Sequence, residues 1–113
     1  TIKSYTIIDL EEAGALQKKY LSNFDIKNIE FQTNLDYNKN KYDFCISNYA
    51  FSECNKDVQI AYLNDIILNS THGYMINNRK DDYSKEDLLE LIPNSKLLPE
   101  IPLTGENNYV IYW

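Results

Sequence analysis

Hydrophobic and polar residues alternate between positions 42 and 47, and this period of two predicts a β-strand. An apolar stripe at helical spacing then extends to Ser70 and predicts an amphipathic helix, with Ser52 or Asn55 as its cap. Residues 73–76 are a short, mostly apolar run after a glycine, which is typical of a buried strand. The strand residues are Tyr42, Phe44 and Ile46 alternating with Asp43, Cys45 and Ser47, and the helical stripe is Val58, Ile60, Ala61, Leu63, Ile66 and Ile67.

This order of elements predicts a βαβ unit with two parallel strands. The polar loop after the first strand then lies at the carboxyl edge of the sheet, where open α/β sheets bind ligands. Ser47, Asn48 and Tyr49, followed by Ser52 and Glu53, are therefore the first candidates for a functional site.

The preceding residues predict another strand, helix and strand. Residues 4–9 are rich in β-forming residues and end in an acid, and residues 10–21 have a helical apolar face with two acids in the first turn. Residues 26–33 alternate again, and residues 34–41 are a polar, Asn-rich loop.

The C-terminal part predicts one more helix and two strands. After a charged linker at residues 79–82, Ser84 is positioned to cap a short helix that ends before Pro93. Residues 96–101 and 109–113 are predicted to pair as an antiparallel hairpin. We therefore expect an α/β fold for residues 1–113, organised as a single domain around a mostly parallel sheet.

Composition narrows the function classes. The chain has 113 residues and a net charge of -6 at pH 7. Such a chain lacks the positive field that attracts phosphate backbones, so neither nucleic acid nor an anionic membrane is an expected partner. Its apolar runs are far shorter than a membrane span, and no secretory signal is visible. Cys45 and Cys54 are expected to be free thiols in the cytoplasm, and without a Cys/His cluster no metal site is expected.

Two further groups of residues carry candidate chemistry. His72 is the only histidine, but it precedes the 73–76 strand and so belongs to the amino edge, away from the expected site. Asn77, Asp81 and Asp82 follow that strand and could touch a substrate or a divalent cation, although a solvated charge run is the favoured interpretation.

Several segments together resemble the sugar O-methyltransferase family, which belongs to the class I S-adenosylmethionine-dependent methyltransferases. They cover nearly the whole chain in order, and the resemblance implies a Rossmann-like, three-layer sheet that ends in an antiparallel hairpin. The segments are Tyr5-Thr-Ile-Ile-Asp-Leu10, Leu16-Gln-Lys-Lys-Tyr-Leu21, Asp43-Phe-Cys-Ile-Ser-Asn-Tyr-Ala-Phe-Ser-Glu53, Gly73-Tyr-Met-Ile76, Glu100-Ile-Pro-Leu-Thr104 and Val110-Ile-Tyr-Trp113.

The resemblance implies a cofactor role for residues at three strand ends. Asp9, next to Leu10, matches the acid that accepts hydrogen bonds from the ribose hydroxyls, although Asp9 is also a good helix N-cap. Thr33 and Asn34, after Gln32, match the region beside adenine, and a polar turn is an equal alternative.

The third strand end implies contacts to the reacting part of the cofactor. Ser47, Asn48 and Tyr49 match the loop beneath the methionine portion, where the ring of Tyr49 would attract the sulfonium or would simply pack. Glu53 is the candidate general base for the acceptor hydroxyl, whereas a glutamate in a first helical turn also suits the helix dipole.

The sequence departs from the family at its cofactor-binding loop. The family has a Gly-rich loop after a central strand, whereas this chain has only Gly14, Gly73 and Gly105. We therefore expect an N-terminally incomplete sheet and a chain that is an excerpt of a longer protein. Either the strands at Tyr5 and Phe44 pair directly, or their gap is filled by a missing N-terminal segment or by strand exchange in a homodimer.

The expected function is S-adenosylmethionine-dependent methyl transfer to a hydroxyl, with a saccharide as the small-molecule acceptor and with this chain alone inactive. The alternative is a catalytically inactive α/β module that serves as an interaction or scaffold domain. A third hypothesis, a different small α/β nucleotide binder, would lack the C-terminal antiparallel hairpin.

Overall fold

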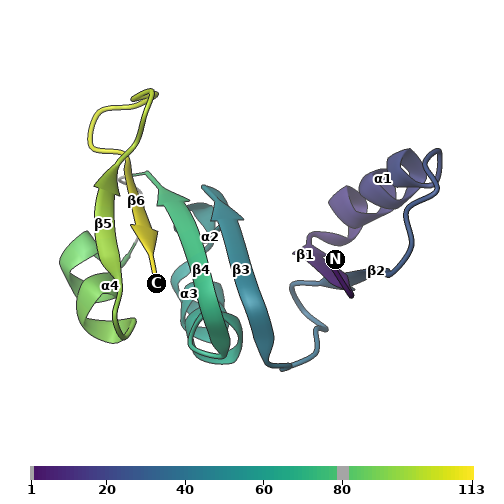
Figure 1. Ribbon diagram of the computed structural model, residues 1–113, viewed down its shortest axis with the longest axis horizontal. Coiled ribbons are helices and arrows are strands. Elements are labelled where there is room, and N and C mark those ends of the chain that lie inside the picture. Colours follow the sequence, from purple (N-terminus) through teal and green to yellow (C-terminus); the bar gives the residue numbers. More distant parts are fainter. Residues whose placement is uncertain (1, 79–81) are drawn as a thin grey trace. The chain divides into compact units, whose positions relative to one another are not determined.

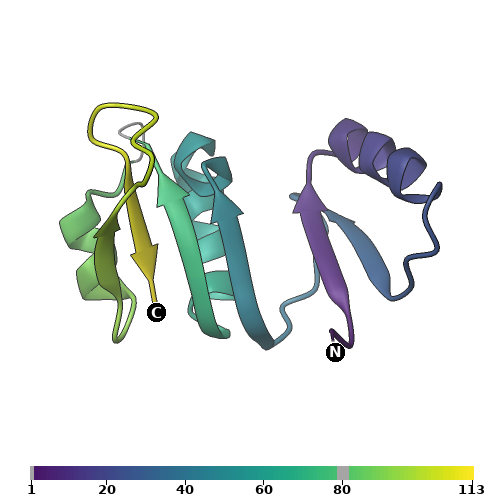
Figure 2. The same ribbon diagram turned by 45° about the horizontal axis from the view of Figure 1, so that its top comes forward.

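The computed structural model describes residues 2–78 and 82–113, and the chain forms two compact α/β units, Thr1–Asn38 and Lys39–Trp113. In the first unit, β1 (Tyr5–Asp9) and β2 (Ile29–Thr33) are parallel and are joined by α1 (Glu11–Leu21) (Figure 2). The register pairs Tyr5 with Ile29 and Asp9 with Thr33. Both strands therefore end at the same edge, as the sequence predicts.

The second unit contains a mixed sheet of four strands in the order β3-β4-β6-β5 (Figure 1). The strands are β3 (Tyr42–Asn48), β4 (Ser70–Asn77), β5 (Lys96–Pro99) and β6 (Tyr109–Tyr112). β3 and β4 are parallel, and β6 is antiparallel to both β4 and β5. The predicted parallel pair and the predicted hairpin are thus both confirmed.

The two units contribute separate sheets. β1 pairs with β2, and β3 pairs with β4, so the strands at Tyr5 and Phe44 are not partners among the described residues. Direct pairing of these two strands, one of the two expected arrangements, is therefore not formed.

Helices follow the strands of the second unit where local sequence signals place them. They are α2 (Ala50–Glu53), α3 (Lys56–Tyr62), a π-helical turn η1 (Leu63–Ile67) and α4 (Lys85–Leu91). The side chain of Asn55 caps α3, and Ser84 caps α4 in a reciprocal capping box with Asp87. The extended backbone of Cys54 separates α2 from α3, so the predicted amphipathic helix begins at Asn55 and not at Ser52, and α2 is an additional short helix.

The core of this unit lies between the sheet and its helices. Met75 and Ile111 are fully buried and come from neighbouring strands, while Leu88 comes from α4. The other buried apolar residues are Phe51, Leu63, Ile67 and Ile92. Cys45 packs against this core, and burial raises the pKa of its thiol to about 11, so it stays protonated.

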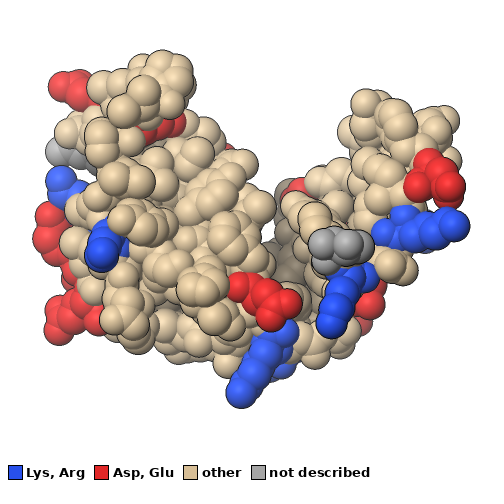
Figure 3. Space-filling view, in the orientation of Figure 1, with Lys and Arg blue, Asp and Glu red and all other residues tan. Residues whose placement is uncertain are grey.

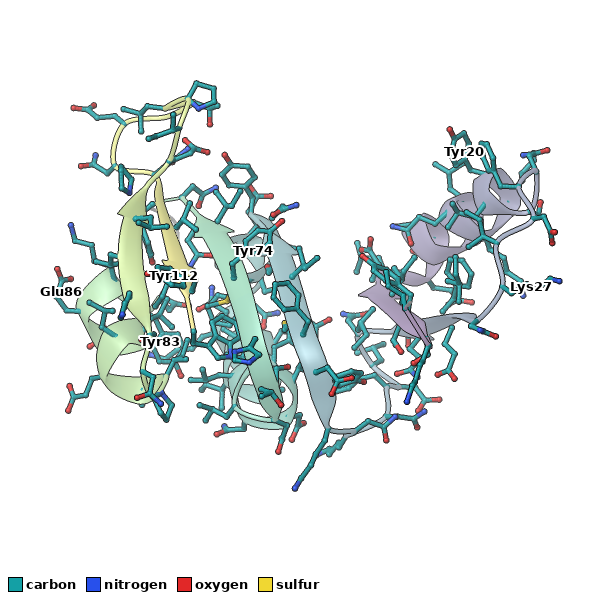
Figure 4. All side chains as sticks on the ribbon, in the orientation of Figure 1. Tyr20, Lys27, Tyr74, Tyr83, Glu86 and Tyr112 are labelled. Carbon is teal, nitrogen blue, oxygen red and sulfur yellow. The ribbon has the colours of Figure 1, made fainter. Side chains whose placement is uncertain are left out.

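The opposite face of the mixed sheet has no helix over it among the described residues of this unit. Phe44 and Ile46 are 55% and 46% exposed there, and Tyr74 and Tyr112 lie beside each other on the same face (Figure 4). The space-filling view shows a broad uncharged surface over these strands (Figure 3). The expected three layers are therefore not seen in this unit, and the alternating apolar residues of β3 do not face the helices.

Candidate functional site

Tyr49 turns the chain from β3 into α2 at the carboxyl edge of the mixed sheet. Its backbone has φ 62°, a left-handed conformation that is uncommon for a residue with a side chain. Hydrogen bonds hold this conformation, since the N–H of Tyr49 donates to the Ile76 carbonyl at 2.7 Å and the Tyr49 carbonyl accepts from the Ser52 hydroxyl at 3.0 Å. Ser47 also contributes, because its hydroxyl accepts from the Phe51 N–H at 3.0 Å. Backbone strain of this kind is common at functional sites.

The side chain of Tyr49 reaches the loop between β5 and β6. Its hydroxyl donates a hydrogen bond to Oε1 of Glu100 and lies 3.0 Å from the hydroxyl of Thr104. These contacts join segments that are 51 positions apart in the sequence. The loop therefore forms part of the same strand-end cluster as Tyr49.

Glu100 is the most heavily hydrogen-bonded carboxylate of this cluster. It is only 7% exposed and accepts from the Thr104 N–H at 2.8 Å, from the Thr104 hydroxyl at 3.0 Å and from Nδ2 of Asn108 at 3.1 Å. Hydrogen bonds to the ionised form, led by the one from Tyr49, lower the pKa of Glu100 to about 2. Glu100 is therefore an anion at neutral pH.

Glu53 lies near the same carboxyl edge of the mixed sheet and faces solvent. It is exposed and occupies the first turn of α2, and its Oε1 accepts from Nδ2 of Asn78 at 3.2 Å. The N–H of Asn78 also donates to the buried Ser52 hydroxyl at 3.3 Å. These bonds connect α2 to the residue that follows β4 and leave Glu53 accessible to solvent.

The first unit has its own strand-end cluster. Oδ1 of Asp9 accepts from the Leu10 N–H at 2.8 Å, and Oδ2 accepts from Nε2 of Gln17 at 2.8 Å. The Asp9 carbonyl accepts from the Asn34 N–H at 3.1 Å, and the Thr33 hydroxyl accepts from the Asp36 N–H at 3.0 Å.

This arrangement brings together the four predicted residues of the first unit and corrects the expected cap. Asp9, Leu10, Thr33 and Asn34 lie at one edge of the β1–β2 pair. Leu10, and not Asp9, occupies the cap position of α1. The Asp9 carboxylate instead binds the following backbone N–H and the α1 side chain of Gln17.

The remaining candidate residues are either exposed or fully buried where they are described. Asn48 is exposed at the end of β3, opposite Ile76. His72 is exposed, as expected for a surface residue, but it lies within β4, which begins at Ser70, and not before the strand. Asn77 is fully buried, and its Oδ1 has no hydrogen-bond partner. Asp82 is exposed, and Asp81 lies outside the described residues.

Sequence patterns did not identify Glu100, Thr104 and Asn108 as site residues. Glu100 was placed inside a predicted strand at 96–101, whereas β5 ends at Pro99. The sequence therefore shows Glu100 only as an acid within a predicted strand, and that position does not indicate which distant side chain the acid contacts.

Comparisons with known proteins add no relatives. No protein-family model matches the chain, and no curated protein and no solved structure matches it either. Across residues 2–78 and 82–113, no helix is long and apolar enough to cross a membrane. The same residues contain no group of three or more His, Cys, Asp or Glu side chains that could hold a metal ion.

Proposed function

We propose that this chain contributes to S-adenosylmethionine-dependent methyl transfer to a hydroxyl group, with a sugar as the acceptor, in a cytoplasmic enzyme. The observation that carries this proposal is the strand-end cluster of Tyr49, Glu53 and Glu100. It combines an aromatic ring, an accessible carboxylate and an ionised buried carboxylate at the edge where α/β sheets bind ligands.

The topology of the second unit supports a Rossmann-like methyltransferase sheet. A parallel β3–β4 pair followed by an antiparallel β6 is what the resemblance implies. The third hypothesis, another small nucleotide binder, lacks such a hairpin and is therefore disfavoured.

Asp9 would bind the ribose of the cofactor. Its carboxylate stands at the end of β1 and is held by the Leu10 N–H and by Gln17, so its direction is fixed before a ligand arrives. A carboxylate has about four lone-pair positions, and two are used here, so two ribose hydroxyls can still donate to it.

The residues at the end of β3 would serve the transfer itself. The cofactor supplies an electrophilic methyl group on a sulfonium. Tyr49 would present its ring to this cation, and Glu53 would accept the proton that the acceptor hydroxyl loses as its oxygen is methylated.

The glycines do not fit the cofactor loop of the family. Gly14 lies inside α1, where an added Cβ would meet nothing within 4 Å, and Gly73 lies in β4 against the ring of Trp113. Neither lies in a loop that leads from a strand into a helix, where the family has its Gly-rich loop. The side chains proposed for the ribose and for the sulfonium are thus present, each within its own unit, whereas these glycines supply no such loop.

The second candidate function is an interaction or scaffold module without catalysis. The uncovered apolar face of the mixed sheet favours it, because exposed apolar patches of this kind mark interaction surfaces. The missing Gly-rich loop favours it as well.

Calorimetric titration with S-adenosylmethionine and S-adenosylhomocysteine tests the proposal. We expect both to bind the unaltered chain and Asp9→Asn to weaken both by roughly tenfold to a hundredfold, because hydrogen bonds to a charged group are worth about 1.5–3 kcal/mol. Asp57→Asn, an exposed acid in the first turn of α3, is the matched control. Absence of binding, or equal affinities for Asp9→Asn and the control, would refute the proposal and favour the scaffold module.

A further inference from the structure

Glu100 is a nearly buried anion whose partners are all neutral. Its hydrogen bonds come from Tyr49, Thr104 and Asn108, and none of these carries a positive charge. An ion pair joins Lys39 to Asp65, at 3.1 Å, and does not involve Glu100. Among the described residues, the negative charge of Glu100 is therefore stabilised by hydrogen-bond dipoles.

Glu100 has little capacity left to bind a ligand directly. Each of its oxygens already accepts at least two hydrogen bonds or close hydroxyl contacts, from Tyr49 and Thr104 on Oε1 and from Thr104 and Asn108 on Oε2. A carboxylate so occupied is a poor general base, because its lone pairs are used and its proton affinity is low. Any effect on a ligand must therefore pass through its neighbours.

The neighbour that leads to the sheet edge is Tyr49. Its backbone is fixed by the Ile76 carbonyl and its hydroxyl by Glu100, so both ends of the side chain are held. Donation of the phenol proton to an anion increases the electron density of the ring, and a ring of higher electron density attracts cations more strongly. The side chain remains only half-buried, so a ligand can reach it.

We propose that Glu100 is a positioning residue that acts through Tyr49 to make this strand end selective for a cationic ligand group. The inference rests on the proposed function in one respect, since the cation is identified as the sulfonium of the cofactor. The loop from Glu100 to Asn108 is thereby part of the binding site. Glu53, which is exposed and bonded to Asn78, keeps its separate role toward the acceptor hydroxyl.

The ratio of affinities for S-adenosylmethionine, which is cationic at sulfur, and S-adenosylhomocysteine, which is neutral there, tests the selectivity. We expect Glu100→Gln and Tyr49→Leu to lower the preference for the cation by roughly threefold to thirtyfold, the range expected for a lost cation–π contact. Glu106→Gln, an exposed acid in the same loop, is the control and should leave the ratio unchanged. An unchanged ratio in Glu100→Gln would overturn the inference.

Hydrogen exchange, measured without ligand, tests the positioning step separately. Tyr49→Phe and Glu100→Gln should each speed exchange in residues 49–53 and 100–108, and the double variant should add little to either, because both changes remove the same bond. Additive effects would show that Glu100 does not act through Tyr49. If exchange is coupled but neither nucleoside binds the unaltered chain, the proposed function and the cation selectivity both fail, while the positioning of Tyr49 stands.

Discussion

At the scale of single residues, the ionisation of Glu100 makes the stability of the fold depend on pH. Hydrogen bonds lower its pKa from 4.5 to about 2, and the folded state therefore binds a proton at Glu100 less readily than the unfolded state. An acid with a lowered pKa in the folded state stabilises the fold at pH values above its pKa in the unfolded chain. This stabilisation is lost as the pH falls toward the folded-state pKa. We expect the contribution of Glu100 to be complete above about pH 5 and to disappear between pH 4.5 and pH 2.

Thermal unfolding of the unaltered chain and of Glu100→Gln across this pH range measures the effect. The variant should be less stable at pH 7, and the difference between the two chains should shrink as the pH approaches 2. Glu106→Gln controls for a general change in net charge. A difference that stays constant from pH 7 to pH 2 would show that the charge of Glu100 does not stabilise the fold.

At the scale of elements, the glycines of α1 and β4 predict opposite effects of the same substitution. Gly14 is inside α1, without a positive φ and with open space around its Cα, so Gly14→Ala should stabilise α1 by roughly 0.5–1 kcal/mol. Gly73 has no such space, because a Cβ there would lie 2.4 Å from the Trp113 ring and 2.8 Å from the Cys45 carbonyl oxygen. Gly73→Ala should therefore destabilise the mixed sheet by about 1–3 kcal/mol.

Amide exchange resolves these two effects because it reports on each element by itself. Protection of α1 amides should rise in Gly14→Ala, while protection of β4 and β6 amides should fall in Gly73→Ala. The result that contradicts this account is a loss of protection in α1 on Gly14→Ala, which would mean that the space beside Gly14 is occupied.

Local signals determined which elements could be predicted from the sequence. The capping side chains of Asn55 and Ser84 accept from backbone N–H groups three residues further on, so both can be predicted as helix starts from the sequence, although Ser52 is an equal candidate for α3. The strand at 42–47 was likewise predicted by its period of two. The sequence does not predict which face of this strand packs against the helices. Phe44 and Ile46 are apolar yet exposed, while Cys45 packs against the core.

The site residues that the sequence does not predict are joined to the others by hydrogen bonds between distant positions. The bond from Tyr49 to Glu100 spans 51 positions, and no periodicity in either segment encodes it. Tyr49 and Glu53 can be predicted as site residues because they follow a strand, and the end of a strand can be located from the neighbouring residues alone. Tyr49 meets its partner because β6 pairs with β4, which brings the β5–β6 loop to the same edge of the sheet.

At the scale of the whole molecule, charge and apolar surface are distributed unevenly. The chain carries a net charge of -6, yet three cross-strand rows on the open face of the mixed sheet contain no acid. The rows are Phe44 and His72; Ile46, Tyr74, Tyr112 and Lys96; and Asn48, Ile76, Val110 and Leu98. Parallel strands are normally covered on both faces, whereas no described helix of the second unit covers this face of the β3–β4 pair.

This open face should bind a hydrophobic dye in the native state. We expect anilinonaphthalene sulfonate to fluoresce with the folded chain and the signal to fall when Phe44 and Ile46 are both replaced by Thr, which removes apolar area but keeps strand-forming residues. The unfolding midpoint should change little, because both side chains are about half exposed already. Leu103→Thr, at a still more exposed apolar residue in the β5–β6 loop, is the control and should leave the dye signal intact. Equal signals from the double variant and the control would place the dye elsewhere and show that this face does not behave as an apolar surface in solution.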